Sequence, residues 1–375
     1  MTNDQRMIRA AAPVIGEDEI EAAVRVLRSG MVAQGPEVAA FEEEFSKFVD
    51  GRHCVAVNSG TSALHLSLMA LGIGPGDEVI VPSFTFAATA NAVRLVGATP
   101  VFADIEPDSF CLSPQAAEAA ITPRTAAIMP VHLYGHPAAM GPLTALAERH
   151  GLAIVEDAAQ AHAASLDGTP VGAFGAAACF SFYPTKNMHS LEGGMVTTGD
   201  ANVARTLRLL RNQGMEQRYA NEIVGFNVRM TDVAAAIGRV QLRSLDTWTQ
   251  QRRANAAALD AGLRGVVTPP VAEGAEHVYH QYTIRVSAAS GKDRDTVSRE
   301  LQERGIGNAV YYPTPVHRLA PFQTGEKVLG YAAGDLPETE RAAAEALSIP
   351  VHPMLTPQEL ERLTATVNEV VGVLA

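Results

Sequence analysis

Short apolar runs alternate with longer helical patterns between about residue 50 and residue 200. The segments TSALHLSLMALG (61–72) and GPLTALAERHG (141–151) carry Ala and Leu at helical spacing, and each ends at a glycine. Alternating strands and helices of this kind predict a largely parallel sheet with helices on both faces. The runs expected as strands are HCVAV (53–57), EVIV (78–81), TPVFAD (99–104), AAIMPV (126–131), LAIVED (152–157) and ACFSFY (178–183).

The segment between Tyr183 and the run MVTT (195–198) breaks this pattern. A parallel crossover needs about a dozen residues or more, usually helical. The segment PTKNMHSLEGG (184–194) is short, opens with proline and closes with two glycines. We therefore expect a loop here, and one antiparallel strand in an otherwise parallel sheet. The fold class predicted for this part is α/β, with the mostly parallel sheet flanked by helices.

The patterning changes after residue 231. The Ala-rich, amphipathic segment 231–263 predicts one long helix that leads out of the sheet. The segment PPVAEGAEHVYHQYTIRV (269–286) returns to strand patterning. Further helices are expected near 295–305 and over 356–374, with a Pro-rich loop between them. These elements predict a smaller C-terminal α+β domain.

Length and composition fit a globular protein of two domains. The chain has 375 residues, of which 47% are hydrophobic and 19% charged, and domains hold roughly 150 residues each. We place the large domain at residues 1–245 and the small domain at 246–375.

Charge and cysteine content exclude several classes of protein. The net charge of −12 argues against a protein that wraps nucleic acid, because such proteins need excess cations. No apolar run reaches the roughly eighteen residues of a membrane span, and the N-terminal segment lacks the apolar core of a signal peptide. The three cysteines are far apart in the sequence, which favours a cytoplasmic protein with thiols packed in the core.

Candidate chemistry gathers where strands end, because ligands of open parallel sheets bind beyond the carboxyl ends of the strands. Asn58-Ser59-Gly60-Thr61-Ser62 joins a strand to a helix. Gly60 lets the backbone approach a ligand, and the first amides of a helix attract phosphate. The alternative is ordinary helix capping by Ser or Thr.

Two further strands end in reactive side chains. Glu156 and Asp157 follow an apolar run and could hold a metal ion, a ribose or a protonated ring nitrogen, or could only cap a helix. Lys186 follows the next strand, where a lowered pKa would make it a Schiff-base nucleophile. The alternative is a solvated surface lysine. Ser181, five residues earlier, could add a hydroxyl to the phosphate site.

Phe86 in VPSFTF also follows a strand. Core packing is its ordinary interpretation, and stacking on a planar cofactor is the functional one. Together, a phosphate cradle, an acid, a lysine and an aromatic ring on one sheet edge are the set that pyridoxal 5′-phosphate needs. No metal site is expected.

These motifs resemble the DegT/DnrJ/EryC1/StrS sugar aminotransferases, which have the type I fold of pyridoxal phosphate enzymes. The resemblance runs from about residue 8 to residue 370, and the ordered set of motifs is specific although no single block is. The motifs are NSGTSALHLSLMALGIGPGDEVIVPSFTF (58–86), IVEDAAQAHAA (154–164), FSFYPTKNMHSLEGGMVTT (180–198) and GFNVRMTDVAAAIGRVQL (225–242).

The resemblance implies a role for each matching residue. Lys186 would form the Schiff base with pyridoxal 5′-phosphate, and Asp157 would pair with its ring nitrogen. Gln160 would meet the ring hydroxyl, and Phe86 would stack on the ring. The expected phosphate contacts are Gly60, Thr61 and Ser181, together with Asn227, which in the family reaches the phosphate of the neighbouring subunit. A homodimer with shared active sites is therefore implied.

Some positions depart from the family pattern. His189-Ser190-Leu191 stands where relatives often have small or hydroxylated residues, and Ala163 and Ala164 follow His162 where a glycine is common. These positions adjoin the expected sugar pocket and leave the substrate open. In the loop YYPTPVH (311–317), Tyr312 and His317 could contact sugar or cofactor, as could His162 and His189; a purely structural histidine is the alternative for His317.

The expected function is transfer of an amino group from an amino acid, with glutamate favoured, to a nucleotide-linked keto-sugar. A sugar dehydratase, or an aminotransferase of a cyclitol ketone, shares the cofactor residues and is distinguished by its product. One dehydratase branch has histidine at the lysine position, and this chain retains Lys186. A regulator on an inactive aminotransferase scaffold is the alternative from another class, and would call for a lost lysine or an added DNA-binding module.

Overall fold

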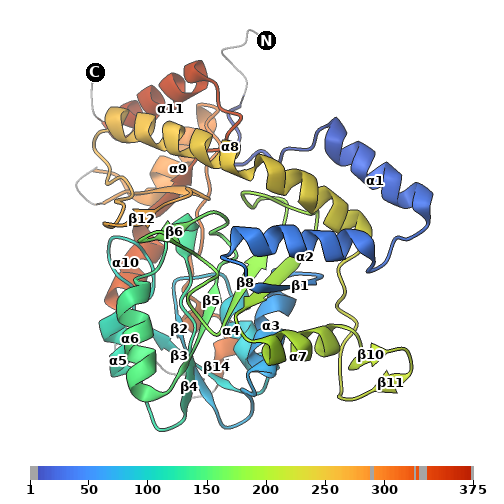
Figure 1. Cartoon of the computed structure of the whole chain (residues 1–375). Helices are drawn as coiled ribbons and strands as arrows, with labels where there is room; N and C mark the ends of the chain where they lie inside the picture. The colour runs from blue at the N-terminus through green and yellow to red at the C-terminus, as the bar shows by residue number, and fades with distance from the viewer. Residues whose placement is uncertain (1–6, 288–290, 325–326, 329–335, 373–375) are drawn as a thin grey trace.

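The central element is a mixed seven-stranded sheet whose strand order is β1-β9-β8-β5-β4-β2-β3 (Figure 1). The computed structural model describes residues 7–287, 291–324, 327–328 and 336–372. Strand β9 pairs antiparallel with both β1 and β8, whereas the pairs among β8, β5, β4, β2 and β3 are parallel. The predicted α/β class and its one reversed strand are thus confirmed. The strands are β1 His53–Val57, β2 Glu78–Pro82, β3 Thr99–Ala103, β4 Thr125–Ile128, β5 Ala153–Asp157, β8 Ala177–Ser181 and β9 Gly194–Thr198.

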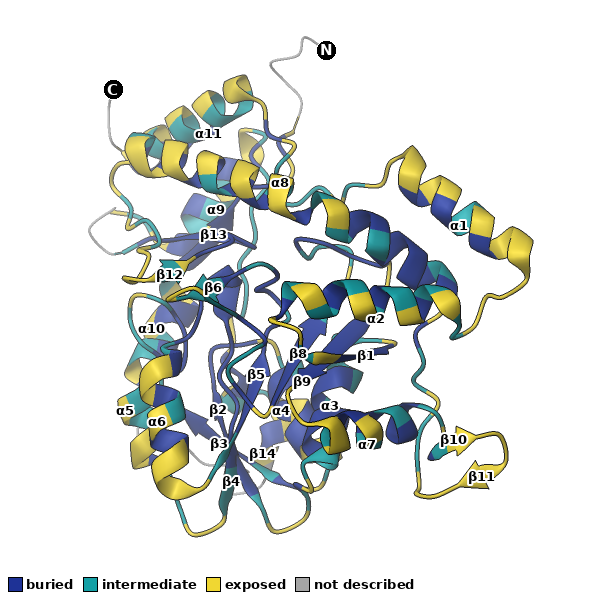
Figure 2. Ribbon diagram, viewed as in Figure 1, coloured by how far each residue is buried: buried dark blue, intermediate teal, exposed yellow. Residues whose placement is uncertain are grey.

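Helices cover both faces of the sheet because the strands are buried at successive positions, and successive side chains of a strand point to opposite faces. Val79 and Val81 of β2 pack in the cluster that holds α3, α4 and α7, whereas Ile80 packs in the cluster that holds α5 and α6. Figure 2 shows the strands as buried and the outer sides of these helices as exposed. The helices of this part are α1 Glu17–Ser29, α2 Pro36–Phe48, α3 Gly60–Ala70, α4 Ala88–Leu95, α5 Pro114–Ala119, α6 Met140–His150 and α7 Ala201–Arg211.

The long helix expected over 231–263 is α8, Asp232–Gly262, capped by the side chain of Thr231. It runs from the sheet to the C-terminal elements (Figure 1). There β13 and β16 form an antiparallel pair, and their apolar residues pack with α9 and α11. The expected last helix ends at Val370, and residues 373 and 374 lie outside the described part. These elements are β13 Tyr282–Arg285, α9 Arg294–Glu303, α10 Pro337–Glu345, β16 Ala346–Ile349 and α11 Pro357–Val370.

The division of the chain at residue 245 stays a prediction. Helix α8 passes through this position without a break. In addition, Ala342 and Ala343 of α10 pack in the same apolar cluster as Ile80 and Phe84 of the large part. The minor strands are β6 Ser165–Leu166, β7 Thr169–Pro170, β10 Met215–Gln217, β11 Ala220–Asn221, β12 Ala275–Glu276, β14 Gln323–Thr324 and β15 Lys327–Val328.

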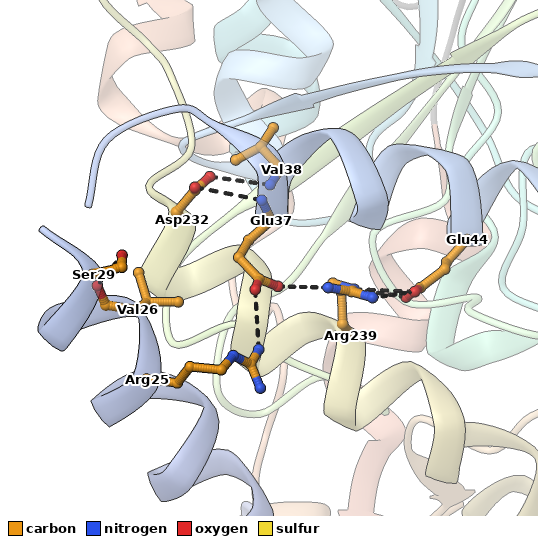
Figure 3. A network of polar contacts seen from close by, with 8 residues as sticks. All are labelled: Arg25, Val26, Ser29, Glu37, Val38, Glu44, Asp232 and Arg239. Atoms are coloured by element: carbon orange, nitrogen blue, oxygen red, sulfur yellow. Dashed lines mark hydrogen bonds and ion pairs between the residues drawn. The ribbon is translucent and has the colours of Figure 1, made fainter. Parts of the chain in front are cut away.

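Helices α1 and α2 are tied to the start of α8 by a network of charged groups (Figure 3). The Asp232 carboxylate accepts hydrogen bonds from the amides of Gly35 at 2.8 Å and Val38 at 3.1 Å, and so caps α2 from a distant part of the chain. Arg239 lies about two turns further along α8. It pairs with Glu37 and Glu44 of α2 at 2.6 Å each. The network orients the N-terminal helices relative to α8.

No helix in the described ranges is long and apolar enough to cross a membrane. Cys54, Cys111 and Cys179 are buried free thiols, as the sequence predicts.

Candidate active site

A cavity of about 330 Å³ lies beyond the carboxyl ends of β1, β2, β5 and β8. Most of the residues singled out in the sequence line it, although they come from five separate segments of the chain. The parallel strands bring these segments to one edge of the sheet. Those lining the cavity are Gly60, Thr61, Phe86, Asp157, Gln160, Ser181, Lys186 and Tyr312.

Lys186 lies in the turn after β8, where its amide donates a hydrogen bond to the carbonyl of Tyr183 at 2.9 Å. The surrounding protein withholds water from its ammonium group, which lowers the pKa of Lys186 to about 8, although the nearby Asp157 carboxylate opposes the shift. At pH 7 about a tenth of the Lys186 side chains are therefore free amines, far more than for an ordinary lysine. A free amine is the form that attacks a carbonyl group.

Asp157 ends β5 and is buried. Its Oδ2 accepts a hydrogen bond from the Thr89 hydroxyl at 2.8 Å, and its Oδ1 accepts one from the amide of Ala159 at 3.2 Å. Burial raises the pKa of Asp157, while the Thr89 hydrogen bond and the Lys186 charge act against that rise. A buried carboxylate that lines a cavity is stabilised by a cation placed there.

The N-terminus of α3 forms the floor of the cavity. The side chain of Ser59 caps the amide of Ser62 at 3.1 Å, and the structure gives the amides of Gly60 and Thr61 no hydrogen-bond partner. A Cβ atom on Gly60 would lie 2.7 Å from the Cβ of Ser181, so only glycine fits there. Unpaired amides beside a serine hydroxyl are suited to a phosphate group.

The opposite wall carries aromatic and amide groups. Phe86 is 62% exposed, so the core-packing interpretation does not hold and its ring is available to a ligand. The Gln160 side chain donates to the Tyr312 hydroxyl at 2.8 Å and accepts from the amide of Tyr134 at 2.7 Å. Tyr312 also lines the cavity and has a φ of +58°, an uncommon conformation for a tyrosine.

Glu156, the neighbour of Asp157, has a structural environment instead. Its buried carboxylate accepts hydrogen bonds from the amides of Gly172, Phe174 and Gly175 and contacts the His132 ring at 3.1 Å. Burial pushes the pKa of Glu156 upward, but these contacts outweigh it and hold the pKa below its ordinary value. Successive side chains of a strand point to opposite faces. Glu156 is therefore held by backbone amides, whereas Asp157 lines the cavity.

Four expected contacts do not line this cavity. The His162 ring is buried between Phe180 and Phe182, and burial lowers its pKa to about 3. His189 lines a second, smaller cavity. The other two are His317, which is held by Ser83 at 2.7 Å and by Glu340 at 3.2 Å, and Asn227, which is exposed. Their roles toward cofactor or substrate stay predictions.

Other residues of the cavity went unnoticed in the sequence. Thr89 donates a hydrogen bond to Asp157. It lies three residues after Phe86, and this closeness in the sequence is the one feature that could have indicated a place near the cavity. Tyr183, Glu192 and His280 also line the cavity. His280 comes from the C-terminal part of the chain, and nothing in the sequence indicates that this segment reaches the sheet edge.

The residues present fit pyridoxal 5′-phosphate. The cavity combines two unpaired amides and a hydroxyl for a phosphate, a buried carboxylate for a ring cation, an exposed aromatic ring, and a lysine whose pKa is lowered. Each of these groups can still contact a ligand, and all of them line the same cavity. The described residues contain no cluster of His, Cys, Asp and Glu that could hold a metal ion.

Comparison with known proteins gives a consistent result. The model of the DegT/DnrJ/EryC1/StrS aminotransferase family matches residues 13–368. The erythromycin biosynthesis sensory transduction protein EryC1 of Saccharopolyspora erythraea is 45% identical over 96% of this chain and 97% of its own. The dTDP-3-amino-3,4,6-trideoxy-alpha-D-glucose transaminase of Streptomyces venezuelae is 45% identical over 96% of this chain and 94% of its own.

A comparison with solved structures finds the same fold. The crystal structure of S. venezuelae DesV in complex with a ketimine intermediate superimposes with a TM-score of 0.89 and is 43% identical. The match covers 96% of this chain and 95% of that one.

Proposed function

We propose, from the premise that this chain belongs to the DegT/DnrJ/EryC1/StrS aminotransferase family, that it aminates a nucleotide-linked keto-sugar with an amino acid as donor. The favoured donor is glutamate, which would leave as 2-oxoglutarate while the keto group of the sugar becomes an amino group. This exchange balances without any further oxidant or reductant. The observation that carries the proposal is the pairing of Lys186, at a pKa of about 8, with the buried Asp157 in one cavity.

The family's cofactor is pyridoxal 5′-phosphate, which when bound supplies an electron sink for the carbon that gains or loses the amino group. Gly60, Thr61 and Ser181 would hold its phosphate. Asp157 would keep the proton on its ring nitrogen, Gln160 would contact its ring hydroxyl, and Phe86 would cover its ring. This assignment rests on the lining of the cavity and on the free hydrogen-bonding capacity described above.

Lys186 would move the proton during transfer. As a free amine it accepts a proton from the α-carbon of the donor, and as an ammonium group it returns a proton to the carbon of the sugar that receives nitrogen. A pKa of about 8 suits both directions, because the acid and base forms are both populated near neutral pH. Thr89 would keep Asp157 oriented throughout.

The support for the regulator hypothesis lies in names: one relative is called a sensory transduction protein, and another, of Geobacillus stearothermophilus, a pleiotropic regulatory protein. The retained Lys186 and the intact cavity favour an enzyme. The dehydratase and the cyclitol aminotransferase share the same cavity residues, so the product decides among them.

The proposal is tested with nitrogen-15 glutamate, a panel of nucleotide keto-sugars and, separately, an inosose. The panel begins with a dTDP-linked 3-keto-sugar, because amination at carbon 3 would give the kind of sugar named for the S. venezuelae relative. Products are identified by mass spectrometry and NMR. Nitrogen-15 bound to a sugar carbon supports the proposal, whereas loss of water without nitrogen uptake identifies a dehydratase, and labelled cyclitol from an inosose identifies the other enzyme.

We also propose a homodimer with shared active sites, in which Asn227 contacts the phosphate of the neighbouring subunit. Asn227 is exposed and lies outside the cavity of its own chain, which suits a residue that serves another subunit. The exposed apolar side chains of α1, Ile20 and Leu27, offer contact area for a partner. A cytoplasmic location is proposed from the three free thiols.

A further inference from the structure

A second cavity, of about 20 Å³, is also lined by Lys186. It shares Thr185, Lys186 and His280 with the large cavity, so the two meet at the lysine. Its other walls come from the loop that carries Lys186, from the N-terminal segment, from α8 and from the C-terminal part of the chain. They include Val14, His189, Gln241, Trp248, Arg252 and His352.

Arg252 of α8 is the cation of this cavity. Its side chain is only 7% exposed, and its Nη1 donates one hydrogen bond, to the carbonyl of Tyr279 at 3.1 Å. The Nε of Arg252 has no hydrogen-bond partner. Within the described ranges, no carboxylate forms an ion pair with it. A buried guanidinium normally has a counter-charge, and here the residues that the structure describes supply none.

Among the residues that line this cavity, none carries a carboxylate. His280 also lines the cavity, its Nδ1 has no hydrogen-bond partner, and it interacts electrostatically with both Lys186 and Arg252. It therefore lies near both side chains. The carboxylate of Glu19 is engaged by the amide of Gly16 at 2.8 Å and by Gln241 at 2.7 Å. It does not line the cavity.

We propose that Arg252, supported by His280, binds the α-carboxylate of the amino donor in this second cavity. The inference rests on the proposed function and adds the donor's binding site to it. The α-carboxylate is one bond from the carbon that reacts at Lys186, so it must enter a space that adjoins this lysine. The phosphates of a nucleotide sugar are separated from the keto carbon by the sugar ring, and the small cavity does not suit them.

The test compares Arg252→Gln with wild-type holoenzyme. Calorimetric titration of the pyridoxal form with 2-oxoglutarate measures carboxylate binding without turnover. We expect the Kd to rise about 10- to 100-fold, because a charge-assisted hydrogen bond is lost. Arg252→Lys should fall between the two. The matched control is Arg253→Gln, because Arg253 pairs with Glu276 and donates to the carbonyl of His277 instead of lining the cavity.

A second measurement uses donors that differ in the α-carboxylate. Conversion of the bound cofactor, followed by its visible absorbance, should be at least about tenfold faster in wild type with glutamate than with 4-aminobutyrate, which lacks that group. Arg252→Gln should reduce this preference by slowing glutamate while leaving the rate with 4-aminobutyrate unchanged; the remaining difference is the intrinsic difference in acidity of the two donor carbons.

The results distinguish failure of the carboxylate site from failure of the proposed function. Equal rates with both donors in wild type, or an unchanged Kd in Arg252→Gln, would overturn the carboxylate site while leaving the amino-transfer proposal intact. If wild type fails to convert its cofactor with glutamate or with any other amino acid, the proposed function fails instead. Should Arg252→Gln not fold, Arg252→Lys takes its place in both measurements, and an unchanged Kd in that variant overturns the carboxylate site.

Discussion

At the scale of single residues, two neighbouring acids have opposite environments. Glu156 is surrounded by hydrogen-bond donors that keep it ionised, whereas Asp157 has two donors, a raised pKa and an open cavity beside it. The carboxyl end of β5 thus offers one saturated acid and one that is stabilised by a bound cation. The sequence predicts that both acids lie at the end of a strand. Their different roles follow only from the direction of each side chain, which the structure gives.

Asp157→Ala should retain part of the cofactor but lose most of its turnover, by about 100-fold or more, because no carboxylate stabilises the ring cation. Asp157→Glu should recover part of the rate if the longer side chain fits. Bound cofactor is measured by absorbance and turnover by product formation. Near-normal turnover in the alanine variant would show that Asp157 only caps the following turn.

The pKa of Lys186 predicts how cofactor uptake depends on pH. The free amine of Lys186 is the form that attacks the aldehyde. Because the pKa is lowered to about 8, the fraction of free amine increases as the pH rises through 8 and then reaches a plateau. Rates of reconstitution of the apoenzyme, measured by absorbance from pH 6 to pH 10, should follow this curve. A rate that still climbs steeply between pH 9 and pH 10 would mean an ordinary exposed lysine.

At the scale of secondary-structure elements, the strand runs and the long helix were predictable because each has a strong local pattern. The reversed β9 followed from the length and composition of the loop that carries Lys186. Contacts between distant elements were not predictable. The cap that Asp232 places on α2 and the approach of His280 to the sheet edge join positions that are far apart in the sequence, and a single chain carries no signal for them.

Asp232→Ala should destabilise the fold. The Asp232 carboxylate is buried and accepts from the amides of Gly35 and Val38, and its removal leaves both amides without partners. We expect a loss of about 2 kcal/mol in the free energy of unfolding, measured with denaturant. Asp246→Ala, on the exposed side of the same helix, is the control and should change this free energy by less than about 0.5 kcal/mol. Equal effects would mean that the network does not hold α2.

At the scale of the whole molecule, the account requires two subunits for each complete site. Lys186→Ala and Asn227→Asp should each give a nearly inactive homodimer, because the first removes the amine and the second repels the phosphate. Unfolding and refolding the two variants together should return roughly a quarter of wild-type activity, since about half of the dimers are mixed and each mixed dimer has one intact site. With refolding verified on wild type, no recovery would show that Asn227 serves its own subunit.

The central claim is that Lys186 is the residue to which the cofactor is attached, and reduction of the holoenzyme with borohydride tests it most directly. Reduction fixes the cofactor to the amine that holds it, and peptide mapping by mass spectrometry then identifies the position. The account predicts the label on Lys186, and no label in Lys186→Ala treated in the same way. A label on Lys47, Lys292 or Lys327 in the wild-type protein would contradict the account.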